Sequence, residues 1–436
     1  MACLAALALA GAAGAQSLIR DAEIEATLER IVDPILRVSG LSPAQVRIYL
    51  IDNPDLNAFV AGGDNIFLHT GLLQRLETVD QVRAVVAHEV GHITGGHLFR
   101  RNEQIRAASG TVGLGVLLAI AAAASGNAEL AIGAGLTSSQ VAERSLLSHN
   151  RAEEASADQA ALRYMEAAGA DPQAILEVMA LFRGQEYGAD MFADPYVRTH
   201  PLWSDRLRFM REGVGNARPG TAPDPGTARL HARMRAKLDG FLEPPSETLR
   251  RRPDDGSEAA LLARAIAWHR LPDIARARAA MAVLLAAHPD DPYYHELAGQ
   301  FALESGRARD AVAAYRRAAE LAPHEPLILS GLGRALIALD TPAATEEALQ
   351  VLTRARRIDK ADARALANLA IAYARLNRPA DASLATAERY MLSGQLRDAG
   401  IHAARAARAF PQGAPGWRQA EDILRVVRRA TSSEGR

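Results

Sequence analysis

The chain has 436 residues, 49% hydrophobic and 23% charged, which is the balance of a folded protein too long for one compact core. Its 50 basic and 51 acidic side chains give a formal net charge of -1, which excludes the strongly basic surface of nucleic-acid-binding proteins. The single cysteine, Cys3, lies in a segment that we expect to be removed, so thiol catalysis and disulfides are excluded from the mature chain.

The first residues have the composition of a secretory signal. A run of Ala, Leu and Gly ends in Ala13-Gly14-Ala15, the small-x-small pattern that signal peptidase cleaves. No Lys or Arg precedes Arg20, which departs from the usual basic start of a signal, so a cytosolic chain is the alternative. We predict a signal peptide over residues 1–15 and export of the mature protein, without a lipid anchor.

The patterns that follow predict a mixed domain. Residues 19–38 carry apolar side chains at helical spacing, which predicts a helix. Residues 46–52 alternate like a strand, and residues 57–68 form a second strand-like stretch. We predict a small antiparallel β element at the mouth of the domain, followed by a long helix over residues 79–101.

An almost wholly apolar stretch over residues 110–136 comes next. It consists of two runs rich in Gly and Ala, and neither reaches the roughly 20 residues needed to span a bilayer. Such runs suit tight burial or a flap over a cleft, and a peripheral membrane contact is the alternative. Helical patterning resumes over 152–168 and 172–183, and a stretch rich in Pro and Gly opens a predicted linker over 217–257.

The last part of the chain consists of helix pairs with a repeating phrase. Pro289 and Pro323 are 34 residues apart, which is the period of the tetratricopeptide repeat. Three residues occupy positions that this pattern expects, namely Gly306, Ala311 and Tyr315. We predict about four repeats over residues 258–429, forming a superhelix that binds a partner, with a purely stabilising cap as the alternative.

The central motif of the long helix is His88-Glu89-Val90-Gly91-His92. Two imidazoles at i and i+4 project from one face of a helix, so their nitrogens can converge on one metal ion. Glu89 is placed toward the open coordination position, where it can act as general base. Because the pentapeptide also arises by chance, the interpretation requires a third ligand.

That third ligand is not found at the metzincin spacing, because Leu98 stands where that pattern has a His. The adjacent His97 is interpreted as a helix-end or packing residue. Glu154, at the start of a later helical segment, offers a carboxylate that completes a His, His, Glu set and leaves one position for water. Asp158, four residues on, can accept a hydrogen bond from the outer nitrogen of a ligating His.

Three motifs in this order resemble the M48 peptidase family of gluzincins. They are residues 88–92, the Glu154-x-x-x-Asp158 pair with Arg151 before it, and the phrase over residues 199–207. The chain also resembles the periplasmic branch of that family that carries C-terminal tetratricopeptide repeats. This likeness extends over nearly all of the chain after the signal.

The resemblance implies roles for several side chains. It makes Glu154 the third zinc ligand, with Glu153 as the off-register alternative. It also places His200 and Arg206 near the metal. There they would stabilise the oxyanion of the tetrahedral intermediate, or His200 would occupy the fourth position and hold the enzyme latent.

The resemblance further implies how substrate is bound. A strand at Asn57-Ala58-Phe59 is expected to pair with the substrate backbone, because addition of a peptide to a sheet edge gives binding that tolerates many sequences. The substrates are therefore expected to be polypeptides.

Together these features predict a mainly α protein. A gluzincin-like metalloprotease domain of the α+β type, with a small β element, is expected over residues 16–216, and an α-solenoid of tetratricopeptide repeats over 258–436. The predicted activity is peptide hydrolysis with one Zn²⁺ per chain. The resemblance implies a periplasmic enzyme that acts on misfolded or misassembled envelope proteins, with the outer-membrane assembly machinery as partner of the repeats. The alternative is a chaperone or adaptor that acts through its repeats and has a latent zinc site.

Overall fold

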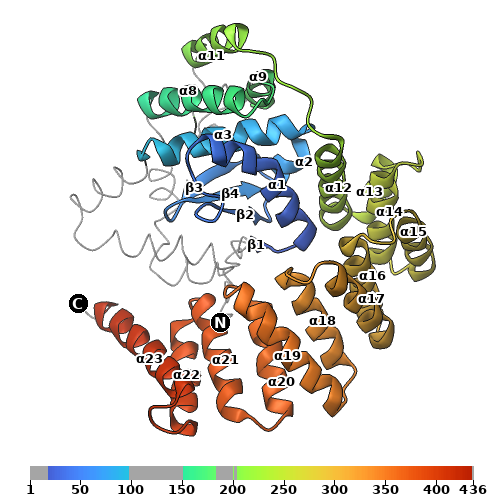
Figure 1. The fold of residues 1–436 in the computed structure, drawn as a ribbon, viewed down its shortest axis with the longest axis vertical. Helices are drawn as coiled ribbons and strands as arrows, with labels where there is room; N and C mark the ends of the chain where they lie inside the picture. Colours follow the sequence, from blue (N-terminus) through green and yellow to red (C-terminus); the bar gives the residue numbers. More distant parts are fainter. Residues whose placement is uncertain (1–17, 98–150, 183–199, 201–203, 435–436) are drawn as a thin grey trace, which may run out of the picture.

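The computed structural model describes residues 18–97, 151–182, 200 and 204–434 (Figure 1). Within these ranges, a small sheet covered by helices forms the N-terminal part, and stacked helix pairs form the C-terminal part. The predicted signal peptide and the apolar stretch 110–136 lie outside the described residues. Of the helices that are described, none is both long and apolar enough to cross a membrane.

The N-terminal part alternates strands with helices. Its described elements are β1 (Leu18–Ile19), α1 (Ala22–Val38), β2 (Arg47–Ile51), β3 (Ala58–Ala61), β4 (Asn65–His69), α2 (Thr70–Arg75), α3 (Val79–Thr94), α8 (Arg151–Ala167), α9 (Gln173–Leu181) and α11 (Ser204–Asn216). Helix α3 ends earlier than the expected limit at residue 101, because Gly95 and Gly96 follow it and Gly96 has a positive φ of 63°.

The sheet has the strand order β1-β2-β4-β3. Strands β3 and β4 form a hairpin across Gly62 and Gly63, whose φ values are 60° and 99°, so both glycines adopt the left-handed conformation that a tight turn needs. Strand β4 then inserts between β3 and β2 and pairs with β2 in parallel. The β element is therefore mixed. The expectation of an antiparallel arrangement was wrong for the pairing of β2 with β4, because the hairpin returns the chain to the direction of β2, whereas β1 pairs with β2 in antiparallel.

Helix α3 lies at the centre of this domain and packs against α1, α8, α9 and β3 (Figure 1). It begins with a capping box, in which Thr78 and Gln81 each satisfy a backbone N–H of the other, and it is buried from Val79 to His92. Gly91 faces α8 so closely that a Cβ there would lie 2.8 Å from the backbone oxygen of Ala157. The absence of a side chain at Gly91 therefore lets α8 approach the motif-bearing face of α3.

The C-terminal part consists of helices only. In chain order they are α12 (Pro225–Leu242), α13 (Pro245–Arg251), α14 (Glu258–Arg270), α15 (Ile274–Ala287), α16 (Pro292–Glu304), α17 (Ala308–Leu321), α18 (Pro326–Ala338), α19 (Pro342–Ile358), α20 (Ala363–Arg375), α21 (Pro379–Leu392), α22 (Leu396–Ala409) and α23 (Pro415–Glu434). Consecutive helices from α14 onward pack on one another as an α-solenoid (Figure 1). The predicted fold class, a mainly helical chain with a small β element and a repeat array, is confirmed.

The packing between successive helices explains why the repeat pattern places a large residue on one helix and small residues on its neighbours. Tyr315 of α17 is buried between two glycines, since a Cβ at Gly299 would lie 2.6 Å from its ring and a Cβ at Gly331 would lie 2.3 Å from it. Ala311, one turn earlier, is also fully buried. Small residues on α16 and α18 therefore receive the large ring of α17, which links one repeat to the next.

Residues 217–257, where the sequence predicts a linker, are mostly helical, since they contain α12 and α13. Asp224 caps α12, and Pro225 stands in its first turn, so the prolines that indicated a linker instead start a helix. Met234 of α12 belongs to the core of the N-terminal domain, whereas Ala236 belongs to the core of the first repeats. Because α12 joins both cores, the limits at residues 216 and 258 stay predictions.

Candidate metal centre

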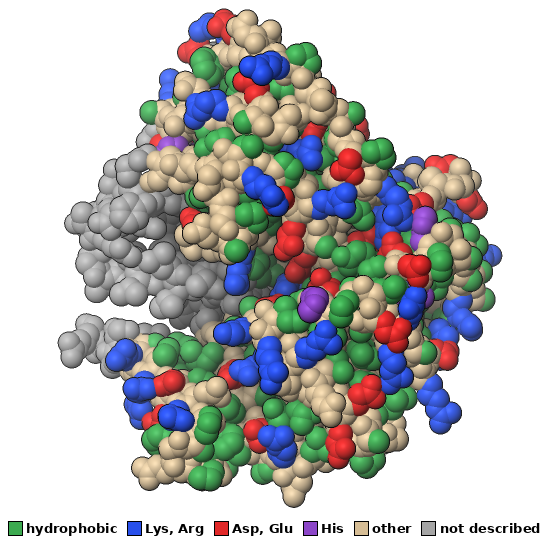
Figure 2. Space-filling model, viewed as in Figure 1, with side chains coloured by type: hydrophobic (Ala, Val, Ile, Leu, Met, Phe, Trp, Pro, Cys, Tyr) green, Lys and Arg blue, Asp and Glu red, His purple; other side chains and the backbone are tan. Residues whose placement is uncertain are grey.

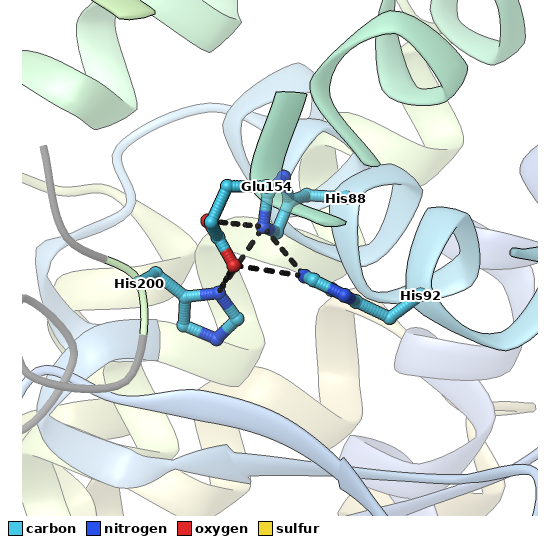
Figure 3. A group of neighbouring side chains, drawn as sticks. All are labelled: His88, His92, Glu154 and His200. Atoms are coloured by element: carbon cyan, nitrogen blue, oxygen red, sulfur yellow. Dashed lines mark hydrogen bonds and ion pairs between the residues drawn. The ribbon is translucent and has the colours of Figure 1, made fainter. Parts of the chain in front are cut away.

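Four buried side chains converge on one point in the N-terminal domain (Figure 3). His88 and His92 come from α3, Glu154 from the first turn of α8, and His200 from the chain ahead of α11. Each offers one ligand atom, and the four atoms lie within 4.8 Å of one another. Segments that are far apart in the sequence therefore build a single polar site inside the protein.

The spacing of the ligand atoms fits a tetrahedral metal site. The Nε2 atoms of His88 and His92 are 3.1 Å apart, and Glu154 Oε1 lies 3.3 Å from His92 Nε2. His200 Nδ1 lies 3.0 Å from Glu154 Oε1 and 3.2 Å from His88 Nε2. Ligands held about 2.0–2.1 Å from zinc at tetrahedral angles are roughly 3.3 Å apart, so the cluster has the dimensions of a zinc site.

The carboxylates around His88 favour the positively charged form of its imidazole. Its Nδ1 donates a hydrogen bond to Asp158 Oδ1 over 3.0 Å, which leaves Nε2 as the atom that faces the centre. Burial lowers the pKa of His88, but the hydrogen bonds with Asp158 and Glu154 outweigh it and raise the pKa to about 9. The two carboxylates thus favour positive charge at His88, and binding of a metal at Nε2 competes with protonation of this imidazole.

The other two ligand candidates on α3 and α8 are in the states that metal binding requires. Burial lowers the pKa of His92 well below its usual value, so this imidazole is neutral. Burial raises the pKa of Glu154, but the charges of His200 and Arg206 reverse that effect and bring it well below its usual value. The site therefore combines neutral imidazole with an ionised carboxylate, the donor set that zinc prefers.

Arg206, on α11, binds the two carboxylates beside the cluster. Its Nε lies 2.5 Å from Asp158 Oδ2, its Nη2 donates to Asp158 Oδ1 over 2.9 Å, and its Nη1 lies 2.7 Å from Glu154 Oε2. The same Nη1 donates to the backbone oxygen of His200 over 3.3 Å. Arg206 therefore joins the carboxylates of α8 to the segment that carries His200.

Glu89 lies next to the cluster without belonging to it. Its side chain is fully buried, and among the described residues neither of its oxygens has a hydrogen-bond partner. His200 Nε2 lies 3.6 Å from Glu89 Oε1. Burial raises the pKa of Glu89, which makes the carboxylate a stronger base than it would be in water.

The predicted substrate strand corresponds to β3, at one edge of the sheet. Ala58 and Phe59 lie in β3, and Asn57 precedes it and accepts a backbone hydrogen bond from His69 N over 2.9 Å. Among the strands that the structure describes, β3 pairs with β4 alone, and it packs beside α3. An edge strand thus runs next to the helix that carries the motif.

The structure brings most of the predicted site residues into one place, namely His88, Glu89, His92, Glu154, Asp158, His200 and Arg206. Glu153, the off-register alternative, is outside the group of ligand atoms. The sequence interpretation missed one neighbour, His97, which is buried with its Nδ1 2.8 Å from His92 Nδ1. The sequence feature that could have indicated this position of His97 is the pair of glycines before it, because glycines permit a sharp turn of the chain.

Comparison with known proteins agrees with this geometry. Residues 20–214 match the model of peptidase family M48. Over 361 residues the chain is 27% identical to the beta-barrel assembly-enhancing protease of Escherichia coli (strain K12), which covers 80% of this chain and 72% of that protein. Over 193 residues it is 31% identical to the mitochondrial metalloendopeptidase OMA1 of Schizosaccharomyces pombe, which covers 44% of this chain and 53% of that protein.

A crystal structure of MamA is also similar, with 17% identity and a TM-score of 0.29 over 39% of this chain and 96% of that one. Because this TM-score is low, the similarity to MamA supports no feature of the fold. The family match covers strands β2, β3 and β4, the motif helix and the buried cluster. The chain is therefore a zinc metalloendopeptidase, and its residues 20–214, which match the model of peptidase family M48, carry the buried cluster.

Proposed function

We propose that this protein is an exported, periplasmic endopeptidase that hydrolyses misfolded or misassembled envelope proteins. The observation that carries the proposal is the buried four-residue cluster with Glu89 beside it, in a chain that resembles a beta-barrel assembly-enhancing protease over 80% of its length. The name of that relative refers to assembly of β-barrels, which supports an envelope substrate for this chain. The predicted signal peptide over residues 1–15 supports export.

In the proposed mechanism His88, His92 and Glu154 hold the zinc ion. When bound, zinc supplies a Lewis acid that polarises the scissile carbonyl and makes water more acidic. Glu89 takes a proton from the attacking water and passes it to the leaving amine. Its burial and raised pKa support this role, because such a carboxylate accepts a proton more readily than one in water.

Of the two roles expected for His200, the geometry favours the fourth ligand. Its Nδ1 stands at the same distances from Glu154 and His88 as the other ligand atoms stand from one another. Water and substrate then need His200 to withdraw, so the arrangement described here corresponds to a latent enzyme. Arg206 is engaged with Asp158 and Glu154, so its role in this arrangement is to orient those carboxylates rather than to bind an oxyanion.

The substrate is proposed to add to the edge of β3 at Asn57-Ala58-Phe59. In this kind of pairing the hydrogen bonds are made to the substrate backbone and depend little on the substrate sequence. Such binding suits an enzyme that acts on many unfolded chains. The open edge of β3 and its position beside α3 support the proposal. Only an extended substrate segment can pair in this way, so folded barrels are expected to resist cleavage.

The repeat domain is proposed to bind a protein, with the outer-membrane assembly machinery as its partner. An α-solenoid presents an extended surface built from successive helices, and such surfaces commonly bind polypeptides. On the face seen in Figure 2, acidic and basic side chains are interspersed over the repeats, as suits a protein partner better than a polyanion. The proposed limits of this domain are residues 258–436, preceded by the protease domain over 16–216.

The first experiment measures zinc content and casein hydrolysis in the purified mature chain and in three variants. His88→Ala is expected to lose both zinc and activity, whereas Glu89→Gln is expected to keep one zinc per chain and lose activity. His200→Ala is expected to keep zinc and to raise the rate if His200 holds the enzyme latent. Absence of zinc from the unmodified chain would contradict the proposed function.

A second experiment tests the substrate class in cells and in vitro. A mutant cell that carries Glu89→Gln is expected to accumulate unassembled β-barrel proteins, and the purified enzyme is expected to cleave an unfolded barrel but not the same barrel folded. If Glu89→Gln supports barrel assembly as well as the unmodified chain, the protein acts as a chaperone or adaptor through its repeats.

A further inference from the structure

The two histidine ligands of α3 each have a neighbour on the side away from the cluster. Behind His88 stands the carboxylate of Asp158. Behind His92 stands another imidazole, because His97 Nδ1 lies 2.8 Å from His92 Nδ1 with the rings inclined at 72°. Both imidazoles are buried, with His92 fully enclosed and His97 2% exposed, so this contact is shielded from competing water.

The local sequence delivers His97 to this place. Helix α3 ends at Thr94, and Gly95 and Gly96 reverse the chain, Gly96 with a φ of 63°. His97 then folds back over the last turn of the helix that carries His92. A Cβ at Gly95 would lie 2.5 Å from His97 Nε2, so a larger residue there would push the ring of His97 out of position.

The distance fixes which nitrogen carries the proton. His92 Nε2 points toward the cluster, 3.1 Å from His88 Nε2 and 3.3 Å from Glu154 Oε1, so it must present a lone pair to a metal. A neutral imidazole then carries its proton on Nδ1 and needs an acceptor there. The only ring nitrogen recorded within hydrogen-bond distance of His92 Nδ1 in the described part of the chain is Nδ1 of His97.

We propose that His97 is a positioning residue of the metal centre, which accepts the Nδ1–H of His92 and holds that ring with Nε2 aimed at the zinc ion. The inference rests on the proposed role of His92 as a ligand. It assigns His97 the function that Asp158 has for His88, but without adding a second negative charge to the buried site. Loss of such an outer partner weakens metal binding by about 10- to 100-fold in zinc enzymes.

The test measures the zinc affinity of the full mature chain by competition with a chromogenic chelator, and the absorption spectrum after Co²⁺ replaces zinc. His97→Leu keeps the bulk and removes the acceptor, so the zinc dissociation constant is expected to rise about 10- to 100-fold, with a changed cobalt spectrum. His97→Asn offers a carbonyl oxygen close to the position of Nδ1, so it is expected to restore most of the affinity.

Gly95→Ala provides a second route to the same result, because it displaces His97 without altering either imidazole. It is expected to weaken zinc binding, and to add little when combined with His97→Leu, since both changes break one contact. Circular dichroism of each variant checks that the helices are retained.

Three outcomes would overturn the inference. His97→Leu could bind zinc as tightly as the unmodified chain, or His97→Asn could be as weak as His97→Leu, which would leave His97 a packing role only. Additive losses in the combined variant would also count against it. Absence of zinc from the unmodified chain would instead contradict the proposed function itself, so the two failures are distinguishable.

Discussion

The protein contains two buried polar clusters. They have similar kinds of side chain, but they differ in whether each charged or polar group faces an opposite partner. One is the metal centre between α3 and α8. The other is an ion network on α12, where Arg233 and Lys237 are buried against carboxylates from both halves of the chain. Both clusters are buried and both place carboxylates beside basic groups, so burial alone does not separate a functional site from a structural one.

In the α12 network every charge faces its opposite. Arg233 Nε lies 2.6 Å from Glu23 Oε1, its Nη2 donates to Asp291 over 3.2 Å, and Lys237 Nζ lies 2.7 Å from Asp21 Oδ2. The Tyr294 ring covers the guanidinium of Arg233 at 4.0 Å. The network joins α1 of the protease domain to α16 of the repeats.

In the metal centre, by contrast, atoms with lone pairs face one another. The inner nitrogens of His88 and His92 are 3.1 Å apart, and Glu154 Oε1 is 3.3 Å from the second of them. Such a set is incomplete until a cation enters it. A buried polar cluster in which acceptors converge therefore indicates a ligand, and one in which charges cancel indicates a joint between parts of the fold.

The largest effect is expected from removal of the carboxylate at the metal centre. Glu154→Ala removes a ligand and is expected to lower zinc affinity by more than the roughly 100-fold that loss of an outer partner costs, and to abolish peptide hydrolysis. Glu153→Ala is the matched control on the same turn of α8, and it is expected to keep zinc. Zinc titration and casein hydrolysis measure both, and equal behaviour of the two variants would remove Glu154 from the site.

A smaller but substantial effect is expected from the α12 network. Arg233→Met removes the guanidinium that pairs with Glu23 and Asp291 and leaves the buried Glu23 with Lys237 as its remaining recorded cation, so the free energy of unfolding should fall by about 3–5 kcal/mol. Arg229→Met, on the same helix but 39% exposed, should cost under about 1 kcal/mol. Urea unfolding compares them, and a neutral Arg233→Met would show that packing rather than charge holds this joint.

The same region predicts a dependence of stability on pH. Burial raises the pKa of Glu296 to about 8, and the charges of Asp21 and Glu23 add to the shift while Lys237 opposes it. Because the pKa of Glu296 in the folded chain lies above the ordinary glutamate value of about 4.5, the folded chain holds the proton more tightly than the unfolded chain, and stability falls as pH rises from about 4.5 to 8. Glu296→Gln should reduce that fall. Urea midpoints at the two ends of this range test it, and an unchanged pH dependence in the variant would contradict it.

The smallest effect is expected at the second link between the halves. Arg20 Nη2 lies 2.7 Å from Asp359 Oδ2, but both side chains are partly exposed and Arg20 also pairs with Glu25. Asp359→Asn should therefore lower the free energy of unfolding by less than about 1 kcal/mol, and by less still at high salt. Urea unfolding at low and high ionic strength measures this, and a loss as large as that of Arg233→Met would show that the two links act together.

Several features of the protein were determined by local sequence alone. The spacing of His88, Glu89 and His92 places their side chains on a helix whatever surrounds it, and the 34-residue period predicts the repeat array, because both depend on contacts between near neighbours in the chain. Glu154 and Asp158 could be singled out for the same reason, since they share one face of a helix.

Other features depended on the packing of distant segments. The parallel pairing of β2 with β4, the helix at 225–242 that serves both cores and the return of His97 onto His92 arise from contacts that no local pattern encodes. Likewise the sequence left His200 with two roles, and only the folded chain brings its Nδ1 within 3.2 Å of a histidine 112 residues earlier.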